Sequence, residues 1–149
     1  MSTKSKGDLA EQAAVLHAMK RKWGVAKPVG DRLPYDLIFD IQGQLVKIQV
    51  KSAWLDAIKQ NFVVDNRRTK TNRRVMKRSE YGLSDFDFAL VYLESKDLFY
   101  VFPVEVFIRF GSEIHMVELD KRQRKPVSAK YRDAWDLIQH WAASREILM

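Results

Sequence analysis

The feature that most constrains the fold is a stretch of alternating side chains between residues 34 and 51. Apolar residues occupy every second position within 37–41 and again within 46–50, which predicts two strands that each turn one face toward a core. Gln42 and Gly43 separate the two runs. A two-residue loop at this place predicts a β-hairpin in a fixed register, because a slip by one residue would turn an apolar set to the wrong face.

The opposite face of this hairpin is polar at its open end. The predicted register places Asp36 opposite Gln49, with Lys51 on the same face about 7 Å further along the strand. A carboxylate and an amide oxygen suit a hard cation such as Mg²⁺, and a nearby ammonium can stabilise charge on a phosphate or help to generate hydroxide. An ordinary solvated strand face shows the same alternation, and the spacing alone favours that simpler interpretation.

Length and composition narrow the class of protein. A chain of 149 residues with 46% hydrophobic residues suits a single domain with one core over residues 1–149. The absence of Cys excludes disulfide scaffolds and thiol catalysis, and His17, His115 and His140 lack metal-ligand spacing. No apolar run is long enough to span a membrane and no signal peptide is evident, so we expect a soluble, cytoplasmic protein.

The net charge of +7 comes from one basic segment, residues 67–78, which contains no acid. The other 19 Lys and Arg residues equal the 19 acidic residues in number. Such a run suits a polyphosphate partner such as DNA, and its alternative is a solvated, partly disordered loop. Its basic residues are Arg67, Arg68, Lys70, Arg73, Arg74, Lys77 and Arg78.

A second basic cluster precedes Pro126 and is expected to lie in a loop. It could bind the same polyphosphate partner, or it could simply be solvated, and the sequence favours neither interpretation. Its members are Lys121, Arg122, Arg124 and Lys125.

The first helix is expected to begin near Asp8, which with Glu11 resembles a capping box, and to end at Gly24. Apolar residues at helical spacing predict its core face. Glu11 lies off that stripe, so it either caps the helix or carries a carboxylate toward the hairpin. The predicted core residues are Leu9, Ala13, Leu16, Met19 and Trp23.

Downstream patterns predict a mixture of strands and helices. A short helix should start at Pro103, and a last helix should start at about Ala129 with an apolar stripe that suits the core or a subunit interface. Residues 62–65 are expected to extend the sheet that contains the hairpin. The expected strands are 25–29, 62–65, 86–94, 98–102 and 113–119, and the last helix's stripe is Tyr131, Ala134, Trp135, Ile138 and Trp141.

Glu11 on a helix, Pro34-x-Asp36 and Gln49-x-Lys51 together resemble the PD-(D/E)XK nuclease superfamily. One residue separates Pro34 from Asp36, and Gln49 replaces the usual acid. More closely, the chain is similar to group I intron-encoded homing endonucleases of this superfamily, the type described in cyanobacteria. The longer stretches that carry this similarity are 7–11, 49–51, 66–74, 99–104 and 120–126.

The resemblance implies a restriction-endonuclease-like α/β fold, with a central mixed β-sheet flanked by helices, and Mg²⁺-dependent hydrolysis of DNA phosphodiesters. It implies that Asp36 is the central metal ligand and that Gln49 stands at the second ligand position. Lys51 would assist water activation and charge stabilisation. Glu11 would contact the metal directly or through water. The amide of Gln49 can ligate but supplies no charge, so the number of metal ions stays open.

The implied partner is double-stranded DNA, contacted by the two basic segments. Hydrolysis of both strands requires two active sites and this chain offers one, so we expect a homo-oligomer with two-fold symmetry. The resemblance favours a tetramer over a dimer. Apolar residues near the C-terminus, Trp141 and 147–149, suit a subunit interface.

Two alternatives remain open on the sequence alone. A junction resolvase, another small nuclease of this superfamily with a helix Glu, would cut four-way junctions with little sequence preference. A catalytically inactive nucleic-acid-binding module, marked by Gln49, would bind DNA without cutting it whatever the divalent metal.

Overall fold

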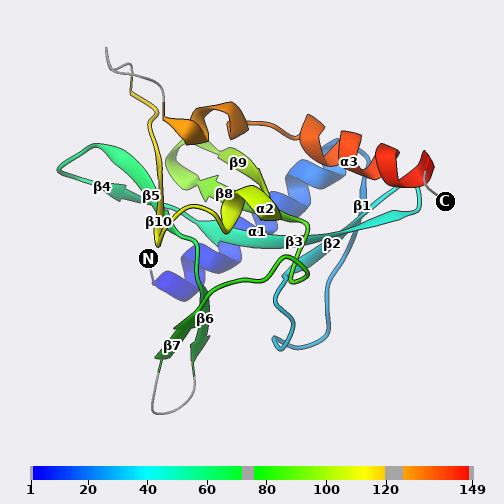
Figure 1. Cartoon of the computed structure of the whole chain (residues 1–149), viewed down its shortest axis with the longest axis horizontal. Helices are drawn as coiled ribbons and strands as arrows, with labels where there is room; N and C mark the ends of the chain where they lie inside the picture. The colour runs from blue at the N-terminus through cyan, green and yellow to red at the C-terminus, as the bar shows by residue number, and fades with distance from the viewer. Residues whose placement is uncertain (1, 72–75, 120–125, 148–149) are drawn as a thin grey trace.

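The computed structural model describes residues 2–71, 76–119 and 126–147. Its largest sheet has five strands in the order β1-β2-β3-β8-β9 (Figure 1). β3 and β8 run parallel, whereas the other neighbours are antiparallel. The predicted mixed sheet flanked by helices is therefore confirmed. The strands are β1 (Gly24–Ala26), β2 (Leu37–Ile41), β3 (Gln44–Ser52), β8 (Phe88–Leu93) and β9 (Leu98–Pro103), with a 3-10 turn, η1 (Glu94–Lys96), between the last two.

The hairpin formed by β2 and β3 has the predicted register, with Phe39 opposite Val46. Gln42 and Gly43 both have positive φ, 52° and 88°, as a two-residue hairpin turn of type I′ requires. Asp40 stabilises this turn, because its carboxylate accepts the N–H of Gly43 at 2.8 Å. The turn therefore works with Gln at a position where Asn is more usual.

A smaller sheet packs on one face of the large one and has the order β10-β5-β4. Its strands are β10 (Glu113–Met116), β5 (Asn61–Asp65) and β4 (Trp54–Asp56). The prediction that residues 62–65 extend the hairpin's own sheet is therefore wrong. Both sides of β3 are already paired, with β2 and with β8, so β5 pairs instead with β4 and β10.

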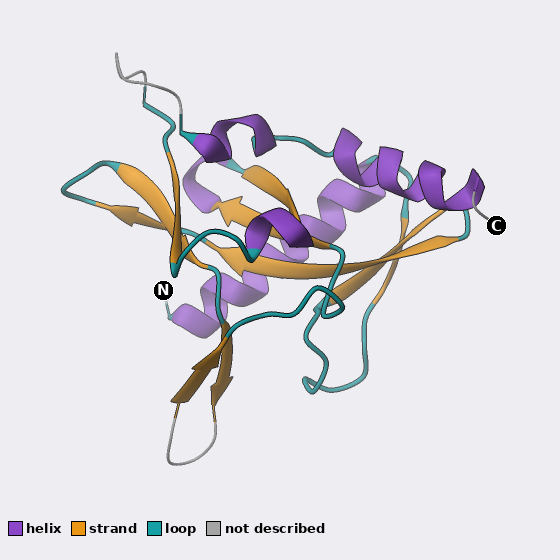
Figure 2. Ribbon diagram, in the orientation of Figure 1, coloured by secondary structure: helices purple, strands orange, loops and turns teal. Residues whose placement is uncertain are grey.

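A third, two-stranded sheet is formed by β6 (Arg68–Thr71) and β7 (Met76–Ser79). These strands project away from the rest of the molecule, at the bottom of the view in Figures 1 and 2. Arg68 pairs with Ser79, and Thr71 pairs with Met76. We call the segment 67–81, which comprises these two strands and their ends, the basic hairpin. The alternative of an irregular solvated loop is wrong for its two paired strands.

Helix α1 (Thr3–Lys20) covers the other face of the large sheet through alanines. Ala10, Ala14 and Ala18 are fully buried, and their small side chains at a spacing of four let the helix backbone approach the sheet closely. The helix starts earlier than predicted, because Ser2 caps it by accepting the N–H of Ser5 at 3.1 Å. The predicted capping box at Asp8 is therefore wrong.

The predicted core stripe of α1 is also largely wrong. Leu9, Leu16 and Met19 are 39%, 51% and 61% exposed, on the side of the helix opposite the buried alanines. The bulky apolar side chains of this core layer come from the sheet, for example Phe39, and leave room only for small residues on the helix. Large apolar residues at helical spacing therefore marked the outer face of α1.

The C-terminal region contains a 3-10 turn, η2 (Val127–Tyr131), followed by α3 (Asp136–Ile147). The predicted single helix from Ala129 is interrupted, because Asp133 adopts a positive φ of 53°. Trp135 and Ile138 are buried as predicted, and the ring of Trp141 packs edge-to-face on Phe88 at 5.9 Å. The core interpretation of this stripe is thus correct, and Trp141 serves the core.

The face of the large sheet that carries the smaller sheet is completed by a short helix, α2 (Val104–Phe107), which begins after Pro103 as predicted. Val104 and Phe107 of this helix are buried against the sheet. Within the described residues, no helix combines the length and hydrophobicity that crossing a bilayer requires.

Candidate active site

Asp36 lies at the point where β2 separates from β3. Its backbone N–H donates to the carbonyl of Ile48 at 2.8 Å, and its carboxylate accepts the N–H of Val50 at 2.8 Å. The regular ladder ends at Leu37 and Ile48, one residue short of the predicted pair between Asp36 and Gln49. The side chain of Asp36 therefore holds the open end of the hairpin, and its orientation is fixed by a backbone partner.

The surroundings of Asp36 disfavour its charge. Burial raises the pKa of this carboxyl to about 6, the hydrogen bond from Val50 acts in the opposite direction, and the negative charge of Glu11 raises the pKa further. The positive charge of Lys51 lowers it. Glu11 and Lys51 influence Asp36 because the fold brings all three into one region, although Asp36 lies 25 positions after Glu11 in the sequence.

Glu11 comes from the middle of α1, so its predicted alternative role as an N-terminal cap is wrong. Its carboxylate is half-buried and lies 3.5 Å from the Nζ of Lys27. Glu11 also acts on the charge of Asp36, so the helix carries a second carboxylate toward the end of the hairpin, and its metal-binding role stays a prediction.

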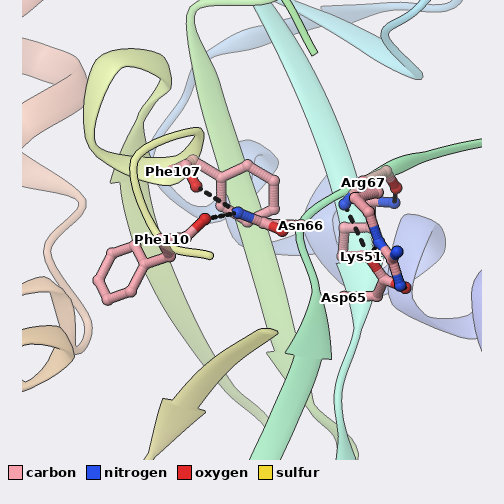
Figure 3. A network of polar contacts seen from close by, with 6 residues as sticks. All are labelled: Lys51, Asp65, Asn66, Arg67, Phe107 and Phe110. Carbon is pink, nitrogen blue, oxygen red and sulfur yellow. Dashed lines mark hydrogen bonds and ion pairs between the residues drawn. The ribbon is translucent and has the colours of Figure 1, made fainter. Parts of the chain in front are cut away.

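Lys51 extends from β3, and its half-buried side chain reaches toward the basic hairpin. The Nζ atom donates to the carbonyl oxygen of Arg67 at 2.9 Å (Figure 3). It also lies 5.2 Å from the centre of the Tyr81 ring. The ammonium therefore occupies a defined place between the hairpin that carries Asp36 and the segment that carries the basic residues.

Gln49 is half-buried on β3, two residues before Lys51. Its amide nitrogen contacts the carbonyl of Val50 at 3.4 Å, a long hydrogen bond. This contact does not involve the amide oxygen, which is the atom that could ligate a cation.

The donor set suits a hard divalent cation. Asp36, Glu11 and Gln49 offer only oxygen ligands, and the mutual repulsion of the two carboxylates would be relieved by a bound cation. Within the part of the chain that the structure describes, no cluster of three or more His, Cys, Asp or Glu side chains could hold a metal ion. An amide oxygen from Gln49 would supply the third protein ligand that the carboxylates alone do not provide.

Comparisons with known proteins identify the family to which this chain belongs. The sequence matches the PD-(D/E)XK endonuclease family over residues 1–138. The chain belongs to the PD-(D/E)XK endonuclease family. The structure of this endonuclease resembles that of a bacterial homing endonuclease, I-Ssp6803I, with 60% sequence identity and a TM-score of 0.92, over 98% of this chain and 99% of that one. No curated protein matches the chain.

In this PD-(D/E)XK endonuclease, the first residue of the predicted DNA-binding segment is engaged in an ion pair. The guanidinium of Arg67 contacts the carboxylate of Asp65 through Nε and Nη2, each at 3.1 Å. Arg67 is therefore less suited to a phosphate contact than the sequence suggests, because part of its charge is already compensated.

The other basic candidates of the endonuclease lie in or near the projecting strands, or outside the described residues. Arg68, Lys70, Lys77 and Arg78 belong to β6 and β7, whose backbones are described. The candidates outside the described residues are Arg73, Arg74, Lys121, Arg122, Arg124 and Lys125. Their DNA-binding role stays a prediction.

Sequence reasoning missed three residues around Lys51 and the Arg67 peptide that accepts its hydrogen bond. Asp65 and Asn66 precede the basic hairpin, and Tyr81 closes it. None is among the motif residues Glu11, Pro34, Asp36, Gln49 and Lys51. Tyr81 meets Lys51 only through tertiary structure, whereas Asp65 contacts Arg67 locally, two residues along the chain. The available signals were the acid at Asp65, two residues before Arg67, and the place of Asn66 in the stretch 66–74 that carries the family resemblance.

Proposed function

We propose that this endonuclease is a site-specific, Mg²⁺-dependent enzyme that cuts double-stranded DNA, of the homing endonuclease type. The observation that carries the proposal is the meeting of Asp36, Glu11 and Lys51 at the open end of one hairpin, in a PD-(D/E)XK endonuclease. The 60% identity with a bacterial homing endonuclease supports the homing type.

We assign the metal to Asp36 as central ligand, with Gln49 and Glu11 as further ligands. A bound Mg²⁺ would polarise the phosphate and lower the pKa of a bound water. The raised pKa of Asp36 fits this role, because a carboxylate that is costly to ionise alone is relieved by a cation. Gln49 contributes an oxygen without charge, so the protein ligands supply two negative charges in total.

The side chains of the protein have separate tasks in this scheme. Lys51 presents a positive charge that would stabilise both the negative charge developing on the phosphate and the hydroxide that forms when the attacking water gives its proton to solvent. Asp36 is oriented by the N–H of Val50, so little reorganisation is needed when the substrate arrives.

We assign the DNA contact to the basic hairpin and to the basic cluster at residues 121–125. The hairpin strands project from the molecule, and their segment contains seven basic residues and no acid from 67 to 78. These charges would contact phosphates, and some Arg side chains could also read guanine in the major groove.

We further propose a two-fold homo-oligomer, with a tetramer favoured over a dimer by the sequence resemblance. Double-strand cutting requires two active sites, and each chain supplies one. Because Trp141 packs in the core, the exposed and uncharged stripe on α1 is the better candidate for contact with a second copy. Leu9, Leu16 and Met19 form this stripe, which we call the outer α1 stripe.

The test is to incubate the protein with Mg²⁺ and, separately, a random-sequence duplex library and a four-way junction. The proposal predicts that a narrow set of duplexes is cut in both strands; a duplex recovered from this set is called the selected duplex below. Cutting confined to the junction would instead indicate a resolvase. Binding without cutting, with any divalent metal, would indicate an inactive DNA-binding module.

A further inference from the structure

Both ends of the basic hairpin meet the ammonium of Lys51. Arg67, the residue before β6, accepts its hydrogen bond at 2.9 Å, and Tyr81, two residues after β7, places its ring 5.2 Å from Nζ. The hairpin strands lie on the far side of these two residues. The lysine is therefore held where the proposed DNA-contacting segment joins the body of the protein.

The peptide that accepts this hydrogen bond is itself fixed by Asp65. The carboxylate of Asp65 accepts the N–H of Arg67 at 2.8 Å and also pairs with its guanidinium. Side chain and backbone of Arg67 are thus both tied to one carboxylate, which restricts the position of the Arg67 carbonyl.

Asn66 fastens the same peptide to the end of α2. Its side chain is 4% exposed, and Nδ2 donates to the carbonyls of Phe107, at 3.1 Å, and of Phe110 (Figure 3). Phe107 is the last residue of α2, so its carbonyl has no partner within the helix. The backbone N–H of Asn66 donates to the carbonyl of Ser112 at 3.2 Å. Three contacts therefore anchor this residue to a segment distant in sequence.

The arrangement of Asn66 is not the one that stability alone would favour. Among the described residues, its buried Oδ1 has no hydrogen-bond partner. A buried acceptor left in this way is destabilising. The Asn66 side chain thus satisfies its amide N–H groups, which hold the peptide leading into Arg67, and leaves its amide oxygen without a partner among the described residues.

We propose that Asp65 and Asn66 are positioning residues for Lys51, which fix the Arg67 carbonyl and through it the catalytic ammonium. The inference rests on the proposed function, because it takes Lys51 as the charge-stabilising group. A lysine ammonium ends a flexible four-carbon chain, so a fixed acceptor determines where its charge lies. A misplacement of about 1 Å can lower a rate by as much as about 100-fold.

The first experiment observes the lysine directly, without DNA or metal. Protein carrying ¹³C,¹⁵N-labelled lysine gives ammonium signals by NMR, and Lys51→Arg identifies the signal of Lys51. We expect Asn66→Ala to shift or broaden that signal and to leave the other lysine signals in place. Ser128→Ala is the matched control, since Ser128 is also buried and donates to a distant carbonyl, that of His115 at 2.7 Å.

The second experiment measures single-turnover cutting and affinity on the selected duplex with Mg²⁺. Asn66→Ala and Asp65→Ala should each lower the cutting rate by about 10- to 100-fold, with duplex affinity changed by less than about threefold. Asp65→Asn should recover part of the rate, because its amide oxygen can still accept the N–H of Arg67. Ser128→Ala should cut at the parent rate, so that a general loss of stability is distinguished from a displaced lysine.

The outcomes separate this inference from the function on which it rests. A Lys51 signal unchanged in both Asn66→Ala and Asp65→Ala would overturn it, and so would a moved signal with cutting within threefold of the parent. If Asn66→Ala does not fold, the NMR signal and the cutting rate of Asp65→Ala test the inference instead. Asp65 is only half-buried, so its replacement is expected to leave the fold intact. If Lys51→Ala itself still cuts, the proposed function fails, while the NMR signal still decides whether Asp65 and Asn66 hold the ammonium.

Discussion

The carboxylate of Asp36 accepts the backbone N–H of Val50 at 2.8 Å, so a single side chain both closes the end of the β2–β3 hairpin and faces Glu11 and Lys51. This double engagement links the stability of the hairpin to the proposed metal site. Changes of pH, of metal and of Asp36 itself should therefore act on stability as well as on cutting.

The first prediction concerns the metal-free protein and pH. Burial holds the pKa of Asp36 at about 6 in the folded state, above its ordinary value of 3.8. Between these values the folded protein binds the proton more tightly than the unfolded chain, so this group's contribution to stability falls as pH rises from about 4 to 6. Asp36→Asn removes that penalty and can still accept the N–H of Val50.

We therefore expect Asp36→Asn to be more stable than the parent by about 1 to 2 kcal/mol at pH 8 in the presence of a chelator, with no gain at pH 4. Denaturant unfolding at both pH values measures this. Asp40→Asn is the control, because Asp40 also accepts a backbone N–H but is exposed. A parent more stable than Asp36→Asn at pH 8 without metal would show that the carboxylate is not penalised.

The second prediction concerns the metal. Mg²⁺ should raise the melting temperature of the parent, because it binds the folded site, and should raise that of Asp36→Asn much less. Gln49→Glu should lower the melting temperature without metal, since it adds a third carboxylate to the proposed ligand set of Asp36 and Glu11, and should gain more from Mg²⁺ than the parent does. Equal gains in all three proteins would place the metal elsewhere.

The third prediction concerns the basic hairpin. The logarithm of duplex affinity should fall with the logarithm of salt concentration by about 0.9 for each phosphate contacted, so Arg73→Ala combined with Arg74→Ala should flatten the slope by up to about 2. Arg145→Ala on α3 is the control, because that exposed guanidinium rests on Trp141, 4.6 Å from the ring centre. An unchanged slope in the double variant would indicate that the DNA binds to another surface of the protein.

The fourth prediction concerns assembly. Leu16 is 51% exposed at the centre of the outer α1 stripe, so Leu16→Glu should reduce the oligomer to a smaller species with little loss of monomer stability. Light scattering at micromolar concentration measures the mass. Gln139→Glu, an equivalent charge on an exposed position of α3, should leave the mass unchanged. A parent that is monomeric and still cuts both strands would contradict the proposed oligomer.

The sequence predicted the parts of the fold that depend on local pattern. The β2–β3 register followed from alternation and a two-residue turn, and both are local properties. The outward face of α1 could not be predicted in this way, since Ala10 and Ala14 are buried only because the sheet already fills the layer with large side chains. The place of β5 likewise depends on which strands occupy the sides of β3.

For the candidate site, the motif singled out Asp36, Gln49, Lys51 and Glu11. The structure brings Glu11 and Lys51 close enough to Asp36 to act on its charge, and the catalytic roles of all four stay a prediction. The motif could not indicate what holds Lys51, because Arg67 and Tyr81, at the two ends of the basic hairpin, meet this lysine only in the folded protein. Residues that meet only through tertiary contacts show no regular spacing in the sequence.

The central claim is tested most directly by Lys51→Ala, with cutting rate, duplex affinity and stability measured on the same preparation. The variant loses the hydrogen bond to the Arg67 carbonyl, so we expect it to fold with a stability lowered by about 1 to 2 kcal/mol. It should bind the selected duplex within a few-fold of the parent and cut it more slowly by a factor of about 100 or more. A folded variant that cuts within a few-fold of the parent rate would contradict the active site described above.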